Sequence, residues 1–272
     1  MPGSIVSISG VAIANVAGIS GRGIANIARF AGRPTSLYSQ EWEFDNQAVN
    51  LTSSGNGWSP TGTHLNWASG TNACSDTNNR WFSTSTRTAT GFRVDSNATG
   101  SNQTGPAGAH NGSGGHDTGA NTRYLFAETS GSLDTNNVFI ARMPAFNPGA
   151  SITDQTNNLD LKFYMHGYGR DCGSLYVYVS TESSTTDGSS NTTLLCQYDS
   201  NESNNTTWTR SSGASTPSSV NFNGNSSSWQ QITVSLNSIR TDKGDRYIYF
   251  VYVGTDSFRG DLSLDTITIE ES

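Results

Sequence analysis

Short segments of alternating apolar and polar residues run from Leu37 to the end of the chain, separated by polar, glycine-rich stretches. In residues 159–166 the apolar side chains occupy every second position, which predicts a β-strand with one buried face. In residues 247–253 apolar side chains occupy both faces, which predicts a central strand covered on both sides. Further strands are predicted at 37–44, 86–94, 123–128, 138–143, 174–180, 193–198, 229–236 and 263–269.

This series predicts an all-β fold, a two-sheet antiparallel jelly-roll sandwich formed by residues 37–272. Serine, threonine, asparagine and the 29 glycines are abundant, and such a composition disfavours helices. The chain is polar enough to suggest disorder. However, a net charge of only −7 and the six Trp, ten Tyr and eleven Phe residues indicate an ordered core.

Residues 1–36 differ from this body, because they combine small residues with regularly spaced aliphatic ones and contain no acidic residue. The segment lacks the early basic residues of a secretory signal, and its glycines disfavour a helix. We predict an extended assembly arm that docks in a homo-oligomer, with a floppy terminus as the alternative. Its apolar positions are Ile5, Ile8, Val11, Ile13, Val16, Ile19, Ile24, Ile27 and Phe30.

Charge and cysteine content restrict the partners. The chain carries 22 acidic and 15 basic residues without a basic stripe, which argues against nucleic acid, and no apolar run is long enough to span a membrane. The three cysteines are not a closed disulfide framework. Cys172 and Cys196 could still form a disulfide if the strands around them pair as a hairpin.

A family resemblance covers residues 38–271. It is carried by the stretches 159–178, 229–234, 247–250 and 258–269, together with the elements 44–45, 116–118, 124–125 and 128–130. In these residues the body resembles a MAM domain, a concanavalin A-like jelly-roll module of cell-surface adhesion proteins and proteases. The body departs from the family by its polar insertions near 97–115 and 181–226 and by the absence of the paired cysteines. It must therefore be held by core packing, aromatic pairs and an ion if one is present.

The arm resembles the amino termini of structural proteins of tailed phages, including cyanophage-type virions. This resemblance implies a non-enzymatic virion structural protein, such as a capsid decoration, neck, tail or fibre component. It would sit on the virion surface and contact other virion proteins through residues 1–36. The alternative is a secreted or cell-surface adhesion module that binds glycans.

Catalytic motifs are incomplete. Jelly-roll glucanases use a Glu-x-Asp-x-x-Glu strand with two catalytic glutamates, but here Ala48 replaces the third carboxylate after Glu43 and Asp45. The four histidines lack metal spacing, and no Gly-x-Ser-x-Gly elbow occurs. We therefore expect no enzyme activity.

Two kinds of binding residue remain. The resemblance to MAM domains implies a calcium ion that joins the first and last strands; calcium prefers oxygen ligands. The matching carboxylates are Asp45, Asp117 and Asp265, with Glu43 and Asp261 nearby, and ordinary surface carboxylates are the alternative. Four tryptophans in polar segments could stack on sugars, or could instead close the ends of the sandwich: Trp58, Trp67, Trp81 and Trp208.

Overall fold

The computed structural model describes much of the body of the protein. The described residues are 39–42, 63–65, 81–85, 92–95, 98, 99, 101, 103–108, 110, 124–129, 137–151, 157–182, 191–201, 207–222, 224, 228–255 and 257–272. The predicted arm, residues 1–36, lies outside them. No helix within the described part is long and apolar enough to cross a membrane.

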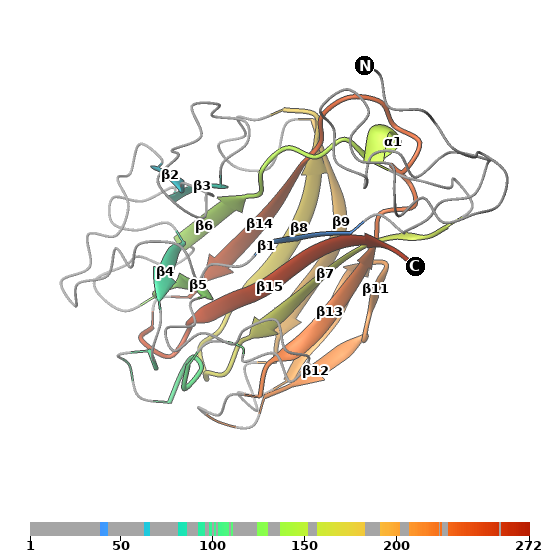
Figure 1. The fold of residues 1–272 in the computed structure, drawn as a ribbon. Helices are drawn as coiled ribbons and strands as arrows, with labels where there is room; N and C mark the ends of the chain where they lie inside the picture. The colour runs from blue at the N-terminus through green and yellow to red at the C-terminus, as the bar shows by residue number, and fades with distance from the viewer. Residues whose placement is uncertain are drawn as a thin grey trace, which may run out of the picture.

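The described strands form two antiparallel sheets that stack face to face (Figure 1), as the sequence predicts. In spatial order, the seven-stranded sheet contains β11 (Ser215–Thr216), β13 (Gln230–Ser235), β7 (Leu159–His166), β15 (Leu262–Glu271), β5 (Tyr124–Ala127) and β4 (Arg93–Asp95), and β1 (Ser39–Trp42) also pairs with β15. The eight-stranded sheet contains β12 (Ser219–Asn221), β10 (Thr207–Gly213), β9 (Thr192–Ser200), β8 (Ser174–Ser180), β14 (Tyr247–Gly254), β6 (Asn137–Arg142), β3 (Trp81–Ser85) and β2 (Thr63–Leu65). One short helix, α1 (Pro148–Ser151), follows β6.

The core lies between the two sheets and follows the alternation in the sequence. On β7 the residues with odd numbers from Leu159 to Met165 are fully buried, whereas Asp160, Lys162 and Tyr164 are partly exposed. Rings from the two sheets meet across the core, and the centroids of Phe163 and Phe250 lie 5.1 Å apart in an edge-to-face arrangement. Burying these side chains provides the main driving force for the sandwich.

The central strand β14 is buried on both faces, as its apolar sequence predicts. Ile248, Phe250 and Tyr252 belong to the main core. Tyr249 and Val251 belong to a second apolar cluster on the outer face of the eight-stranded sheet. The outer face of this sheet is therefore partly apolar.

The possible Cys172–Cys196 disulfide does not form, because both thiols are free and buried. Strands β8 and β9 do pair as the hairpin that such a bridge would need. In that register, however, Cys196 lies opposite Val177, and Cys172 precedes the first residue of β8. The two cysteines are therefore offset along the hairpin and cannot face each other.

Candidate functional site

The predicted cation ligands are only partly within the described residues. Glu43, Asp45 and Asp117 lie outside them. Asp261 immediately precedes β15 and Asp265 lies within it, and both are fully buried. The described residues contain no cluster of three metal-binding side chains.

The two buried carboxylates serve different parts of the fold. Asp261 Oδ1 accepts hydrogen bonds from the backbone N–H of Thr129 (3.1 Å) and from its hydroxyl (3.4 Å). Asp265 accepts from the backbone N–H groups of His110 (3.0 Å) and Thr266 (2.9 Å), at a point where β15 bulges against β7. Because four strand residues span about 13 Å, the two carboxylates cannot reach one ion together. This corrects the expectation that they share a site.

The predicted sugar-stacking tryptophans are also only partly within the described residues. Trp58 and Trp67 lie outside the described residues, as does the side chain of Trp81 on β3. Trp208 on β10 is 1% exposed, and its indole N–H donates a 2.6 Å hydrogen bond to the carbonyl oxygen of Gly167. The prediction that Trp208 stacks on a sugar is therefore wrong. Its ring instead belongs to the main hydrophobic core.

Another pair of aromatic side chains occupies the outer face of the eight-stranded sheet. On β8 the aliphatic residues Leu175, Val177 and Val179 point into the core, so Tyr176 and Tyr178 point outward. Both tyrosines are half-buried, and their rings are nearly parallel, with centroids 6.0 Å apart and an angle of 11° between the planes. The two rings form a small aromatic surface that remains accessible.

Polar side chains border these rings on the neighbouring strand β9. Gln197 lies directly opposite Tyr176, and its amide donates a 2.8 Å hydrogen bond to the carboxylate of Asp199. Burial tends to raise the pKa of Asp199. Hydrogen bonds from Ser174, Ser211 and Gln197 outweigh this tendency and hold the pKa below its usual value. Asp199 is thus an ionised hydrogen-bond acceptor beside the rings.

The hydroxyl of Tyr178 is a neutral group at physiological pH. Burial, and then the neighbouring Tyr176, raise the pKa of Tyr178 above its ordinary value. A neutral phenol both donates and accepts hydrogen bonds. The face therefore offers two rings, an amide, a carboxylate and a hydroxyl donor.

Strands β14 and β6 provide a fixed base for this face. Tyr249 lies between Tyr178 on β8 and Arg142 on β6, and its hydroxyl donates a 2.7 Å hydrogen bond to the carbonyl oxygen of Glu182. The guanidinium of buried Arg142 lies 5.2 Å from the centroid of the Tyr247 ring. Burial lowers the pKa of Arg142. These packed neighbours restrict the movement of the half-buried Tyr176 and Tyr178.

Sequence reasoning predicts β8 as a strand but does not single out its tyrosines. The sequence feature that could have identified them is the alternation along the strand: one set of alternating positions is aliphatic, and the other set contains the two tyrosines with a serine at each end. Because a tyrosine hydroxyl needs a hydrogen-bond partner, the aliphatic parity is the one expected inside.

The comparisons with known proteins concern the fold. No family model and no curated protein sequence matches the chain. Among solved structures, the K1 cleaved adhesin domain of Lys-gingipain from Porphyromonas gingivalis W83 is 16% identical. That match covers 85% of this chain and 96% of the adhesin domain, with a TM-score of 0.43.

Two other solved structures extend the comparison. The K2 cleaved adhesin domain of Lys-gingipain is 14% identical over 85% of this chain and 98% of that domain, with a TM-score of 0.43. The family 11 carbohydrate-binding module from Clostridium thermocellum, in complex with a β-1,3-1,4-mixed-linked tetrasaccharide, is 13% identical. It matches over 70% of this chain and 87% of the module, with a TM-score of 0.31. The relations to MAM domains and to phage proteins stay predictions.

Proposed function

We propose that the protein is a non-enzymatic adhesion module that binds a glycan on the outer face of the eight-stranded sheet. The observation that supports this proposal is the pair of half-exposed, nearly parallel rings of Tyr176 and Tyr178 beside Gln197 and Asp199. Aromatic rings present an apolar surface to the C–H faces of a sugar, and amide and carboxylate groups bind its hydroxyls.

The geometry favours binding over catalysis. The rings and their polar neighbours project from paired central strands, so little conformational entropy is lost when a ligand binds. Glycoside hydrolysis needs a carboxylic acid with a raised pKa to protonate the leaving group. The pKa of Asp199 is instead lowered, which suits an acceptor of hydrogen bonds from hydroxyls.

A glycan array with the full chain, followed by calorimetric titration of the glycan that scores, tests this proposal. We expect the double variant Tyr176→Ala, Tyr178→Ala to lose about tenfold or more in affinity, because truncating central aromatic contacts typically costs about 2 kcal/mol. The double variant with Phe at both positions keeps the rings and is expected to retain most of the affinity. Melting temperatures show whether each variant is folded. Absence of any glycan ligand, or full affinity in the alanine variant, would contradict the proposal.

A second proposal concerns residues 1–36 and rests on their sequence alone. Their recurring aliphatic residues and lack of acidic residues favour an arm that joins copies of the chain, in a virion or another extracellular assembly. Light scattering of the full chain and of a variant lacking residues 1–36 tests it. A multimer that becomes a monomer on deletion supports the arm, and an unchanged number of copies in the assembly refutes it. The deletion is not expected to change glycan affinity, so the two proposals can fail separately.

A structural calcium ion is a third, independent proposal, with Asp265, Asp45 and Asp117 among its ligands. Ion binding to the folded state alone raises the melting temperature. We expect a chelator to lower the melting temperature and added calcium to restore it. An unchanged melting temperature in both conditions removes the ion.

A further inference from the structure

Three loops meet at one end of the sandwich, and hydrogen bonds join them. They are residues 103–108, the turn 167–173 between β7 and β8, and the described residues 255 and 257–261 between β14 and β15. Gly105 N–H donates to Tyr168 O (2.9 Å), and Asp171 N–H donates to Arg259 O (3.2 Å). The hydroxyl of Thr104 accepts from the backbone N–H of Asp261 (3.1 Å). The loops therefore form one unit in place of three independent segments.

Close backbone approaches fix this unit further. A Cβ atom on Gly169 would lie 2.0 Å from the carbonyl oxygen of Arg259, and one on Gly260 would lie 2.6 Å from that of Asp171. The hydroxyl of buried Tyr252 donates to Gly260 O and accepts from the N–H of Gly173. The outer side chains of the loops thus stand on a closely packed base.

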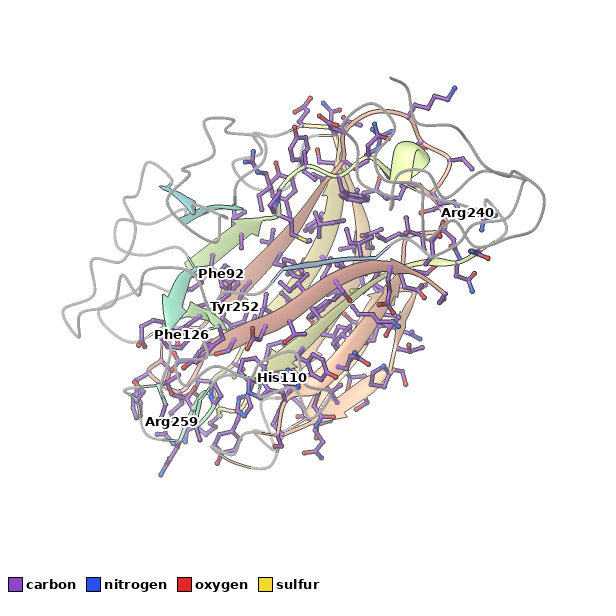
Figure 2. The ribbon with its side chains drawn as sticks, in the orientation of Figure 1. Phe92, His110, Phe126, Arg240, Tyr252 and Arg259 are labelled. Atoms are coloured by element: carbon purple, nitrogen blue, oxygen red, sulfur yellow. The ribbon has the colours of Figure 1, made fainter. Side chains whose placement is uncertain are left out.

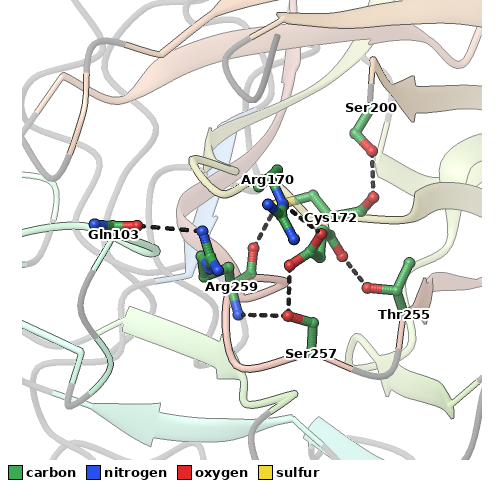
Figure 3. A network of polar contacts seen from close by, with 8 residues as sticks. Gln103, Arg170, Cys172, Ser200, Thr255, Ser257 and Arg259 are labelled. Atoms are coloured by element: carbon green, nitrogen blue, oxygen red, sulfur yellow. Dashed lines mark hydrogen bonds and ion pairs between the residues drawn. The ribbon is translucent and has the colours of Figure 1, made fainter. Parts of the chain in front are cut away.

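Figure 3 shows how polar side chains connect the two turns. The carboxylate of Asp171 accepts a 2.5 Å hydrogen bond from the hydroxyl of Ser257. It also forms an ion pair with Arg170, whose Nε lies 3.2 Å away. Burial tends to raise the pKa of Asp171. The hydrogen bonds from Ser257 and Arg170, and the charges of Arg170 and Arg259, outweigh it and lower the pKa. Both guanidinium groups therefore lie near the same carboxylate.

The outward surface of this unit combines positive charge with an exposed ring. The side chain of Arg170 is 55% exposed. Phe258 is 48% exposed and is the only large hydrophobic side chain among the described residues that is exposed to this degree. The guanidinium of Arg259 lies 5.0 Å from the centroid of the Phe258 ring and donates from Nη1 to the side chain of Gln103 (3.3 Å). Gln103 is itself exposed.

This end of the sandwich has more hydrogen-bond donors than acceptors. Each guanidinium has five N–H donors. Arg170 uses its Nε for Asp171, and the buried Nε of Arg259 makes no hydrogen bond within the described part of the chain. Gln103 adopts a left-handed backbone conformation with φ of 67°, which is costly for a residue other than glycine and often marks a ligand-binding position. The two guanidinium groups can together donate hydrogen bonds to an anionic group beside the Phe258 ring.

We propose that this loop end, comprising Gln103, Arg170, Ser257, Phe258 and Arg259, is a second binding site, for the carboxylated sugar of an acidic polysaccharide. The planar guanidinium groups match a carboxylate in two-bond geometry. The Phe258 ring offers an apolar face to the sugar ring, and the uncharged Gln103 and Ser257 can bind its hydroxyls. The site contains none of the residues proposed for the glycan-binding face on β8 and β9.

Calorimetric titration of the full chain with a hexamer of galacturonic acid tests this site, with the methyl-esterified hexamer as the uncharged probe. We expect the acid to bind and the ester to bind at least about tenfold more weakly. Added salt should weaken the binding of the acid but not that of the ester. Arg170→Gln and Phe258→Ala alter exposed side chains and are each expected to reduce affinity about tenfold. Arg259→Gln is expected to have the same effect.

Two controls separate this site from general charge and from the sheet face. Arg240 lies at the opposite end of the sandwich (Figure 2), so Arg240→Gln is expected to leave affinity for the acid unchanged. The tyrosine double variant on β8 is also expected to bind the acid normally. The proposal is overturned if the acid does not bind, if the ester binds equally well, or if Arg170→Gln and Phe258→Ala bind like the parent. Equal affinity for a polyglutamate peptide of the same charge also overturns it, since that would indicate an acidic peptide site.

Discussion

The contact between Gly167 and Trp208 gives a quantitative test of how the loop end is supported. A Cβ atom on Gly167 would lie 2.7 Å from three atoms of the Trp208 indole, closer than real Cβ contacts allow. The backbone of Gly167 is not in the left-handed region, so alanine would bring steric overlap without backbone strain. Trp208 is buried and cannot move into solvent. Overpacking of this kind costs about 2–3 kcal/mol, so Gly167→Ala should lower the melting temperature by roughly 4–10 °C.

A double-mutant cycle assigns this cost to the indole. Trp208→Phe alone loses the hydrogen bond to Gly167 O and part of the ring volume, which together cost about 2 kcal/mol. In that background the added methyl group enters the vacated space, so the two costs should fall short of additivity by at least about 1 kcal/mol. Gly108→Ala is the matched control, because a Cβ atom there has no neighbour within 4 Å. Chemical denaturation measures the four proteins of the cycle and the Gly108→Ala control, and additive costs, or a Gly167→Ala variant as stable as the parent, would refute the packing argument.

Three further predictions concern titratable groups. Because the folded pKa of Asp171 is lowered, its carboxylate stabilises the fold above the unfolded pKa of about 3.9 and loses this effect as the pH falls through the folded pKa. Asp171→Asn should therefore reduce stability by about 1 kcal/mol at pH 7, with the difference closing in acid in pH-dependent melting curves. Burial raises the pKa of Cys196 to about 12 and that of Cys172 well above its usual value, so mass spectrometry should detect alkylation of either thiol at pH 8 only after denaturation. Since the pKa of Tyr178 is raised and that of Asp199 is lowered, glycan affinity should stay constant between about pH 5 and 9, and a transition within this range would argue against their roles.

The sandwich was predictable where burial and side-chain polarity coincide along a strand. Strand β7 alternates between apolar and polar residues, and its bounds, Leu159–His166, are those that the alternation predicts. Strand β14 was predictable because its apolar residues occupy both alternating faces, so both faces must be covered. In both cases the order of apolar and polar residues within the strand itself shows which faces are buried, so the local sequence is enough to predict the strand.

Strand β10 was not predictable for the opposite reason. In Thr207–Gly213, Trp208 is buried, while the other residues are polar or glycine and are at least partly exposed. Hydrogen bonds to β9 and β12 on either side hold this segment in the sheet. Pairing partners that are distant in sequence, rather than the local pattern, determine such a strand.

The same distinction explains why the sequence pattern did not predict that Trp208 is buried while Tyr176 remains accessible. Trp208 has polar neighbours, which suggested exposure, but in a strand those neighbours lie on the other face or at a bulge, and the ring itself points inward. Tyr176 has apolar neighbours, but Leu175 and Val177 occupy the inner face and leave the tyrosine outside. For an aromatic side chain in a sheet, the polarity of adjacent residues therefore describes the opposite face. The parity of the aliphatic residues is the better guide to which rings can meet a ligand.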